Sequence, residues 1–488
     1  MKLQLVNAPL IASTKFGEIS QNMWPPLAIM YLASYLRKNL RHKIEIKLTD
    51  GLLEGFSQTS KIIDSYGPDI MAVSSLTSNV TGAYKIINQA KKQNPNLFVI
   101  TGGVHASALP EDIFKRSETD LIIVGEGEQT FLEVIKSLLE KKSFSNIRGL
   151  ALRKDGQILT TKPRGFIHNL DQIPFPAHDL LENRDKYVGW FFKKQKPETA
   201  IMSTRGCPFN CYFCANIIWK SGKPWLRMRS PKNVVDELEW LVKDYGTKEY
   251  FDVADEFNCS IPWALEVCDE IIKHKLNLTW KCQLRADRVT EELAKKMAKA
   301  GCWYIHLGAE SGNQKTLDGI GKKITPDQVE ESARILKKYG IKVDILLMLF
   351  NIWEEKGKLQ YEGVRESLQT LAFADHLKKK KAADFIGWSP TTPYPGSQLF
   401  RTARKYNLIK KSQLIHWERW NNVWGMPAFL PGISKKDYMR VKTRGTLIQL
   451  KYVFSMRKYI NFGNFIDLSK RILALLLYTF ENLKRAMK

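Results

Sequence analysis

Three of the seven cysteines of this 488-residue chain fall within eight residues, in the sequence GCPFNCYFC. Cys207, Cys211 and Cys214 have the spacing C-x3-C-x2-C. Cysteine thiolates are the usual protein ligands of soft metals and iron–sulfur clusters. A structural zinc site requires four protein ligands, and neither a second C-x2-C nor an H-x3-H sequence lies nearby. Three thiolates fit a four-iron cluster that keeps one iron open for a substrate or cofactor, and zinc is the alternative.

The other four cysteines are isolated in the sequence, at Cys259, Cys268, Cys282 and Cys302. We expect each to be a small core residue. An odd number of cysteines with one tight cluster does not suit a disulfide framework. It indicates a reducing compartment and a metal site.

The cysteines lie in a stretch, residues 196–400, that alternates strand and helix patterns. Strand-like segments at 249–254, 278–283, 303–308 and 341–350 are each followed by a helix-like segment, and a last strand is expected near 384–389. About six such units predict an open or closed barrel of parallel strands. Chemistry in such barrels takes place at the carboxyl ends of the strands, and the cysteines follow the first strand.

Residues 1–145 show the same alternation and predict a separate, doubly wound parallel sheet. Ligands of such sheets bind at the carboxyl ends of the strands. Small or polar residues lie there: Asp50, Ser74–Ser75–Leu76–Thr77, Gly102–Gly103 and Gly125–Glu126–Gly127–Glu128. No G-x-G-x-x-G occurs in this half, so a dinucleotide is not expected. The glycines indicate wide loops over a large flat ligand, and an unliganded scaffold is the alternative.

The remaining segments connect or extend these two units. Residues 146–195 contain a predicted β-hairpin at 149–161, around Asp155–Gly156, and a linker with two prolines at 171–181. Residues 401–488 form a basic, helical C-terminal region. For its last stretch, 469–488, we consider a helix packed on the barrel and a helix that contacts a membrane surface or a lipid-like substrate. The same two alternatives apply to its aromatic residues, Trp417, Trp420, Trp424, Tyr452, Phe454 and Tyr459.

The formal net charge of +25 suits an anionic partner, such as a phosphate-bearing cofactor, a nucleic acid or an acidic membrane surface. No Arg-Gly-Gly tract or helix-turn-helix pattern supports nucleic acid. The N-terminus lacks the pattern of a signal peptide, and the apolar run 472–480 is far shorter than the roughly 20 residues that span a bilayer. We expect a cytoplasmic protein whose contact with membranes, if any, is peripheral.

With Phe213 before its last cysteine, the cysteine motif resembles that of the radical S-adenosylmethionine (SAM) enzymes. The resemblance implies a 4Fe-4S cluster whose open iron binds SAM, and a 5′-deoxyadenosyl radical that abstracts hydrogen from an unactivated carbon. The segments FDVADEFN, WKCQLRAD and HLGAESGNQKTLDGIGKKIT resemble further parts of that barrel. By this resemblance, SAM contacts are expected from Phe213, Asp255, Arg285, Glu310 and Ser311. His306 is interpreted as a core histidine.

The N-terminal half resembles the cobalamin-binding domain that is fused to many radical SAM enzymes, in WPPLAIMYLASYLR, VITGGVHASALPEDIF and DLIIVGEGEQTFLEVI. DQIPFPAHDLL resembles the linker of that group, and TPYPGSQLF resembles the end of its barrel. The resemblance implies a Rossmann-like domain with cobalamin contacts from Ser75, Thr77, Gly102, Gly103, His105, Gly125, Glu126 and Gly127. For His105, ordering of its own loop is the alternative role.

Two departures from the family pattern stand out. The D-x-H-x-x-G motif, which supplies a histidine ligand to cobalt in other cobalamin proteins, is absent. No histidine can therefore be assigned to cobalt. The G-F-P-G-x-T loop expected after the fifth barrel strand reads LMLFNIWEEKG, at residues 347–357. That loop lies beside SAM or substrate in the family, so its change implies an unusual substrate or altered SAM contacts.

The resemblance favours a cobalamin-dependent methyltransferase that acts on an unactivated carbon of a small or lipid-like molecule. Flavodoxin or ferredoxin is the expected class of electron donor. No catalytic side chain is assigned. The alternatives are a radical cyclase or rearrangement enzyme, an RNA-modifying radical enzyme and a non-catalytic binding protein. The RNA-modifying type is disfavoured because no cysteine precedes Cys207 and the C-terminus has a helical pattern.

Overall fold

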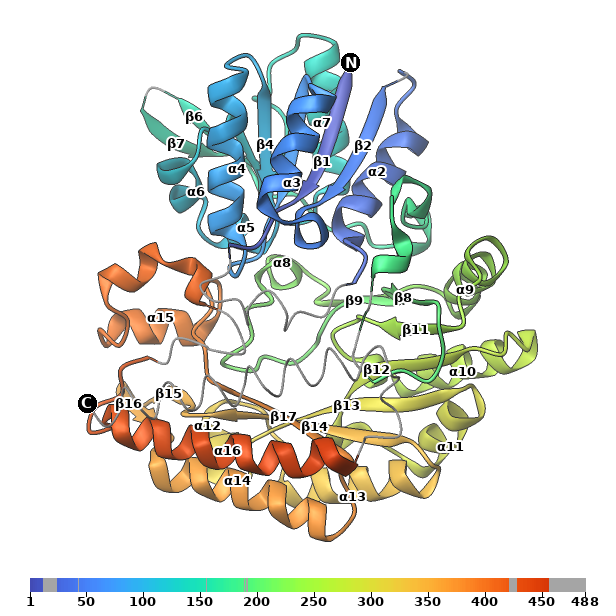
Figure 1. The fold of residues 1–488 in the computed structure, drawn as a ribbon, viewed down its shortest axis with the longest axis vertical. Helices are drawn as coiled ribbons and strands as arrows, with labels where there is room; N and C mark the ends of the chain where they lie inside the picture. The colour runs from blue at the N-terminus through green and yellow to red at the C-terminus, as the bar shows by residue number, and fades with distance from the viewer. Residues whose placement is uncertain are drawn as a thin grey trace.

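The computed structural model describes residues 1–11, 24–42, 44–154, 156–187, 189, 192–420 and 428–455. Figure 1 shows two α/β units, one above the other, with a C-terminal helical region along the side and base of the second. The two units face each other across the segment that contains the short helix α8 (Ile217–Lys220). This arrangement confirms the predicted fold class.

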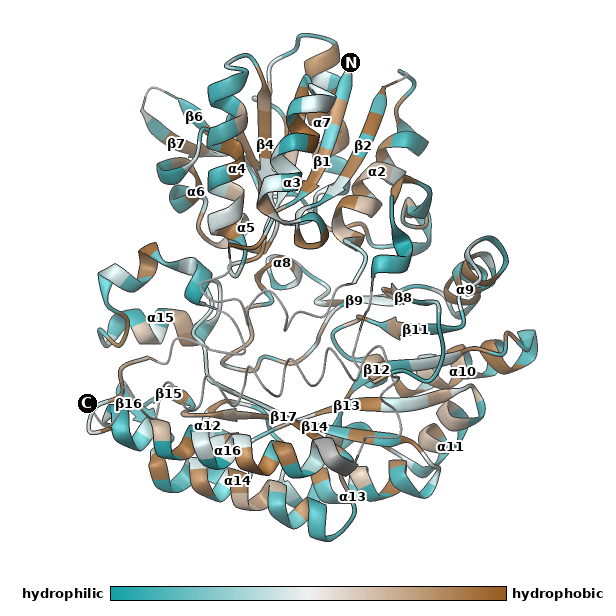
Figure 2. Cartoon of the chain, viewed as in Figure 1, coloured by the Kyte–Doolittle hydropathy of each residue, from teal (hydrophilic) through white to brown (hydrophobic). Residues whose placement is uncertain are grey.

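The N-terminal unit is a seven-stranded sheet in the order β2-β1-β3-β4-β5-β6-β7. Its first five strands are parallel: β1 (Lys2–Asn7), β2 (Glu45–Asp50), β3 (Ile70–Ser74), β4 (Phe98–Gly102) and β5 (Leu121–Ile123). The central strands are apolar on both faces because helices cover both sides of the sheet, as Figure 2 shows by their brown colour. The covering helices are α2 (Leu27–Asn39), α3 (Gly51–Tyr66), α4 (Val80–Gln93), α5 (Val104–Ala108), α6 (Pro110–Arg116) and α7 (Glu128–Leu139).

The predicted hairpin forms the strands β6 (Leu150–Lys154) and β7 (Gln157–Thr160). It does not stand apart as a connector, because β6 pairs antiparallel with β5 and extends the N-terminal sheet. The chain then passes through three short 3-10 turns at Leu170–Gln172, His178–Leu180 and Arg184–Lys186 before it enters the second unit.

The second unit has six parallel strands in the order β17-β14-β13-β12-β11-β8, which is chain order and makes an open, partial barrel. Its strands are β8 (Glu198–Ile201), β11 (Glu249–Asp252), β12 (Thr279–Arg285), β13 (Cys302–Glu310), β14 (Lys342–Leu349) and β17 (Phe385–Pro390). Between them run α9 (Pro231–Tyr245), α10 (Ile261–His274), α11 (Glu291–Lys299), α12 (Gln314–Gly319), α13 (Pro326–Lys338) and α14 (Val364–Lys379). The predicted set of six strand–helix units is confirmed.

Local sequence signals set the ends of these helices. Ser230 caps α9 by accepting a hydrogen bond from the N–H of Asn233, with proline at the first helical position. Gly246 ends α9 in the left-handed conformation, with φ of 62°. Thr325 and Gln328 form a capping box at the start of α13.

Two additional β-ribbons lie at the carboxyl ends of the barrel strands. The cysteines do not directly follow the first barrel strand, because a short strand β9 (Thr204–Gly206) intervenes and pairs antiparallel with β10 (Leu226–Met228). The loop after β14, which departs from the family pattern, is a hairpin of β15 (Ile352–Glu355) and β16 (Lys358–Tyr361). The aromatic side chain of Trp353 in β15 packs so closely on Gly319 that a Cβ there would lie 2.2 Å from the ring.

The C-terminal region packs on both units where the structure describes it. Helix α15 (Gln398–Lys405) is followed by 3-10 turns at Lys411–Ile415 and Trp417–Arg419, and α16 (Lys435–Ser455) packs on α14 and β17. Trp417 and Trp420 are buried against Val80 and Tyr84 of the N-terminal unit, and Tyr452 is buried too. These three are therefore packed structural residues. Trp424, Tyr459 and residues 469–488 lie outside the described residues, as does the side chain of Phe454. Among the helices of the described residues, none has the length and hydropathy of a membrane-spanning segment.

Candidate functional site

The three clustered cysteines lie in the loop between β9 and β10, and all three line one cavity at the carboxyl ends of the barrel strands. Tyr212 holds this loop through its backbone. Its N–H donates to the carbonyl of Ile320 at 2.8 Å, and its carbonyl accepts from the N–H of Leu399 at 2.9 Å. Its hydroxyl accepts from the N–H of Glu354 in β15 at 3.1 Å. The loop is thus braced from three directions.

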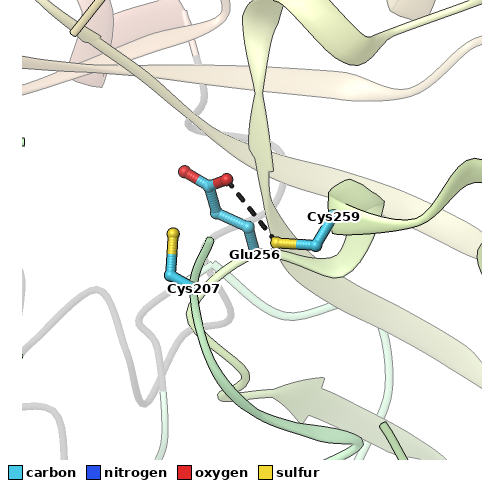
Figure 3. A group of neighbouring side chains, drawn as sticks. All are labelled: Cys207, Glu256 and Cys259. Carbon is cyan, nitrogen blue, oxygen red and sulfur yellow. Dashed lines mark hydrogen bonds between the residues drawn. The ribbon is translucent and has the colours of Figure 1, made fainter. Parts of the chain in front are cut away.

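A second thiol and a carboxyl group lie beside Cys207. Figure 3 shows Cys207, Glu256 and Cys259 close together, and their ligand atoms all lie within 4.8 Å of one another. The sequence predicted a core role for Cys259, and the side chain is indeed buried, but it borders the cysteine loop. Its hydrogen bond to Cys207 lowers the pKa of Cys207, whereas burial raises the pKa of Cys214 to about 11. Sequence spacing gave no sign of this contact.

The donor set fits an iron–sulfur cluster, because three thiols face one cavity and buried cations lie next to them. Lys322 lines the same cavity, and Arg285 Nη1 is 3.9 Å from the sulfur of Cys211. Burial raises the pKa of Cys211, and these cations oppose that shift by favouring the thiolate form that binds metal. Cys268, Cys282 and Cys302 lie in the barrel core, as predicted.

Three of the residues expected to contact SAM line the cysteine cavity: Phe213, Asp255 and Glu310. The cavity and its open mouth enclose about 720 Å³. Asp255 accepts a hydrogen bond from Asn216 Nδ2 at 2.6 Å, and burial raises its pKa. Glu310 ends β13 in the left-handed conformation, with φ of 63°, and accepts from Lys322 Nζ at 3.0 Å.

Two of the expected SAM residues lie behind the cavity wall. The Arg285 guanidinium is 3.8 Å from the centre of the Phe209 ring and 2.7 Å from Asp287. Ser311 is fully buried, and its hydroxyl is within hydrogen-bond distance of Thr370 Oγ1, at 2.8 Å. Both side chains support the residues that line the cavity.

The structure adds Lys322 to the cavity residues and places His306, which the sequence marked as a core histidine, at the cavity wall. Lys322 is buried, and a charged partner keeps it protonated: burial opposes the charge, but Glu310 beside it raises its pKa. His306 lines the cavity, and its Nδ1 lies 3.0 Å from Asp344 Oδ2. His306 is buried, as expected for a core histidine, and it also borders the cavity. Its partner Asp344 lies on the neighbouring strand, so no local motif marks this pair.

A second cavity lies at the carboxyl ends of the N-terminal strands, and its far wall comes from the barrel unit. Five of the residues assigned to cobalamin line it: Gly102, Gly103, Gly125, Glu126 and Gly127. The barrel unit contributes Met202, Arg205, Ile218 and Trp219. A Cβ at Gly103, where φ is 98°, would lie 2.5 Å from the carbonyl oxygen of Ser75. Glycine is required at this turn.

Ser75, Thr77 and His105 do not line the second cavity. His105 is fully buried behind it, with Nδ1 3.1 Å from the Thr77 hydroxyl and Nε2 3.3 Å from Asp112. Its ring packs edge-on against Trp417 at 4.9 Å. This placement supports the loop-ordering alternative for His105.

The second cavity suits a large ligand with apolar faces. Its walls are mostly aliphatic and aromatic, and with its open mouth it encloses about 1000 Å³. The described lining residues include no histidine, in agreement with the missing D-x-H-x-x-G motif. The glycines let the backbone approach a flat ring closely. These features fit cobalamin without a histidine ligand from this wall.

Family comparisons agree with both cavities. The radical SAM superfamily model matches residues 201–359, and the B12 binding domain model matches residues 18–135. An uncharacterized methyltransferase of Pyrococcus horikoshii is 33% identical over 427 residues, which cover 87% of this chain and 87% of that relative. The chain belongs to the cobalamin-binding radical SAM enzymes.

Two further proteins match at lower identity. The anaerobic magnesium-protoporphyrin IX monomethyl ester cyclase of Rubrivivax gelatinosus is 28% identical over 441 residues, covering 88% of this chain and 73% of the cyclase. The structure of the radical SAM methyltransferase TsrM of Kitasatospora setae, with cobalamin and a [4Fe-4S] cluster bound, has a TM-score of 0.66 at 17% identity. The match covers 84% of this chain and 79% of TsrM, and it shows a shared fold.

Proposed function

We propose that this radical SAM enzyme is a cobalamin-dependent methyltransferase that acts on an unactivated carbon of a small molecule. One observation carries the proposal: a single short segment separates the two cavities. Cys214 and Asn216 line the cysteine cavity, and Ile218 and Trp219, immediately after them, line the glycine-rich cavity. A substrate that reaches this segment is close to both cofactors.

Each cofactor has a set of residues that would hold it. Cys207, Cys211 and Cys214 would bind the cluster. Phe213, Asp255, Glu310 and Lys322 would contact SAM, with Lys322 as the cation for its carboxylate. The wall at Gly102–Gly103 and Gly125–Gly127 would receive cobalamin. When bound, these cofactors supply a hydrogen-abstracting radical and a methyl group.

The residues of the chain itself orient the reactants and exclude water. The hairpin β15–β16 holds the cysteine loop through Tyr212, and it takes the place of the expected glycine–proline turn. The imidazole of His306, held by Asp344, is a polar group in the wall of the same cavity. An electron donor of the flavodoxin or ferredoxin class would reduce the cluster. Membrane contact through the C-terminal region is a secondary proposal.

The test uses SAM labelled in its methyl group. The protein is reconstituted anaerobically with iron, sulfide and cobalamin, and incubated with reductant and extracts of candidate small molecules. We expect label in a product and formation of 5′-deoxyadenosine, and loss of both in Cys211→Ala. Deoxyadenosine together with an unlabelled, oxidised product would contradict methyl transfer.

That second outcome would support a radical cyclase, the activity named for the 28% identical relative from Rubrivivax gelatinosus. We favour methyl transfer because the relative with higher identity, at 33%, is named a methyltransferase.

A further inference from the structure

Two arginines of the barrel unit insert into the N-terminal unit as a buried ion-pair network. Arg205 in β9 and Arg227 in β10 are directly paired across the ribbon. Arg205 Nη2 lies 2.5 Å from Glu128 Oε1, and its Nη1 lies 3.3 Å from Glu126 Oε1. Arg227 Nη2 lies 2.7 Å from the same Glu126 oxygen. We call these four residues the interdomain clamp.

The clamp is balanced in charge, and its four side chains are buried. It contains two cations and two anions, and each side chain is at most 7% exposed. Burial by itself would raise the pKa of Glu128, but Arg205 beside it holds that pKa below its usual range. Buried ion pairs contribute little net stability compared with apolar packing, because desolvation offsets their attraction. Their strength lies in fixed, directional geometry.

On the N-terminal side, the clamp holds the wall of the cobalamin-type cavity. Glu126 and Glu128 lie in the segment Gly125–Glu128, which lines that cavity between β5 and α7. Glu126 Oε2 also accepts from Arg227 Nη1 at 3.0 Å and from the N–H of Ile167 at 3.3 Å. The loop is therefore bonded to the barrel unit and to the connecting segment at once.

On the barrel side, the clamp is tied to the cysteine loop. Arg205 lies two residues before Cys207, and Gly206 between them has φ of 89°. A Cβ at Gly206 would lie 1.9 Å from the carbonyl oxygen of Trp225, so the backbone here is pressed against the facing strand. The Arg205 guanidinium also lies 5.6 Å from the ring of Trp219, in the segment that separates the two cavities.

We propose that Arg205 and Arg227 are positioning residues that fix the separation between the cobalamin-type cavity and the cysteine cavity. The guanidinium groups join the loop that lines one cavity to the strand that leads into the other. This inference rests on the proposed function, because it assumes that both cavities hold their cofactors. Radical reactions tolerate little misplacement, since a shift of about 1 Å costs on the order of 100-fold in rate.

The test measures the magnetic coupling between the two cofactors in the full-length protein. The protein is loaded anaerobically with a reduced four-iron cluster and cob(II)alamin, both of which carry an unpaired spin. Their EPR splitting depends steeply on distance. In the wild type we expect one resolved splitting. Because Arg205 itself lines the cobalamin-type cavity, the comparison uses Arg205→Gln protein selected for full iron and corrinoid content, in which we expect loss of the resolved splitting.

A matched control removes a buried arginine whose ion-pair and hydrogen-bond partners all lie within the barrel unit. Arg229 pairs with Glu237 and bonds Asn233 within the barrel unit. Arg229→Gln should keep the wild-type splitting. The double variant Arg205→Gln/Glu128→Gln removes both charges of the Arg205–Glu128 ion pair, so neither charge is left buried without its partner. This guards against misfolding. We expect the double variant to lose the splitting as well.

The outcomes separate the two proposals. If the double variant, loaded with both cofactors, keeps the wild-type splitting, the positioning role of Arg205 and Arg227 is wrong. The methyltransferase proposal would remain intact. Equal loss of the splitting in Arg229→Gln would also overturn the positioning role, because the effect would then be general. A wild-type protein that binds neither cobalamin nor a cluster would overturn the proposed function and this inference with it.

Discussion

At the scale of single residues, the cysteine cavity depends on two opposite charges, on either side of helix α12, that meet at its wall. Glu310 at the end of β13 and Lys322 after α12 meet at 3.0 Å. Lys322 is 4% exposed, so its charge is little screened by water. A buried ammonium group at a thiol-lined cavity is suited to bind the carboxylate of an amino-acid ligand.

Replacement of Lys322 with methionine should therefore weaken SAM binding. A hydrogen bond to a charged group contributes about 1.5–3 kcal/mol, so we expect roughly a 10- to 100-fold loss of affinity. The affinity is measured by calorimetric titration of the cluster-loaded protein with SAM. Lys323→Met is the matched control, because the neighbouring Lys323 is exposed and does not line the cavity. Unchanged affinity in Lys322→Met would remove this residue from the SAM site.

Cys259 supports a second prediction at this scale. Its side chain borders Cys207, yet the three-cysteine motif does not include it. We expect Cys259→Ser to keep a full cluster, because serine retains a hydroxyl that can bond to the Cys207 sulfur, whereas Cys207→Ser should lose it. Iron and sulfide analysis with EPR of the reduced protein distinguishes the two. Loss of the cluster in Cys259→Ser would make Cys259 a ligand.

At the scale of elements, a buried hydrogen-bond network joins the hairpin β15–β16 to Ser311, which lies just after β13 and is expected to contact SAM. Glu362, just after β16, is fully buried and accepts from Asn351 N–H at 3.0 Å and from Thr370 Oγ1 at 3.1 Å. Thr370 in turn contacts Ser311 at 2.8 Å. The loop that departs from the family pattern is thus bonded to the turn after Glu310.

This network predicts a pH-dependent stability. Burial raises the pKa of Glu362 to about 7, above its ordinary value of 4.5. Between these two values the folded protein holds a proton that the unfolded chain releases, so stability falls as the pH rises from about 5 to 7 and levels off above. In Glu362→Gln, the decrease in unfolding free energy between about pH 5 and 7 should be smaller by about 1–3 kcal/mol. The measurement is the unfolding free energy as a function of pH, which should give a flatter profile in the variant. An identical profile in the variant would contradict the assignment to Glu362.

The elements also show what sequence patterns could and could not predict. The repeating strand–helix pattern predicted both sheets, because most of the parallel strands are short runs rich in apolar residues and are followed by helix-like segments. The strands β9, β15 and β16 were missed because each has four residues or fewer, and β9 in addition pairs only with the distant strand β10. Local motifs marked Cys207 and Gly103. Pairs such as His306 and Asp344 carry no such mark, since neighbouring strands bring them together.

At the scale of the whole molecule, the C-terminal region is joined to the N-terminal unit by contacts separate from the interdomain clamp. Trp417 Nε1 donates to Asp112 Oδ2 at 2.8 Å, and Thr81 donates to Glu418 at 3.1 Å. Asp112 also accepts from the hydroxyl of Tyr84 at 2.6 Å. The C-terminal segment is therefore anchored to the helices beside the glycine-rich cavity.

Because His105 lies between Trp417 and the Gly103 turn, loosening this anchor should reach the cobalamin site. We expect Trp417→Phe, which keeps the aromatic packing and loses the N–H, to lower the unfolding free energy by about 1–3 kcal/mol. Trp417→Ala should cost about 3–5 kcal/mol and weaken cobalamin binding, measured by absorbance titration. Trp240→Ala serves as the control, since Trp240 packs on Phe175 and His178 and lines neither cavity. If Trp417→Ala destabilises the protein but binds cobalamin with wild-type affinity, the anchor stabilises the fold without shaping the cavity.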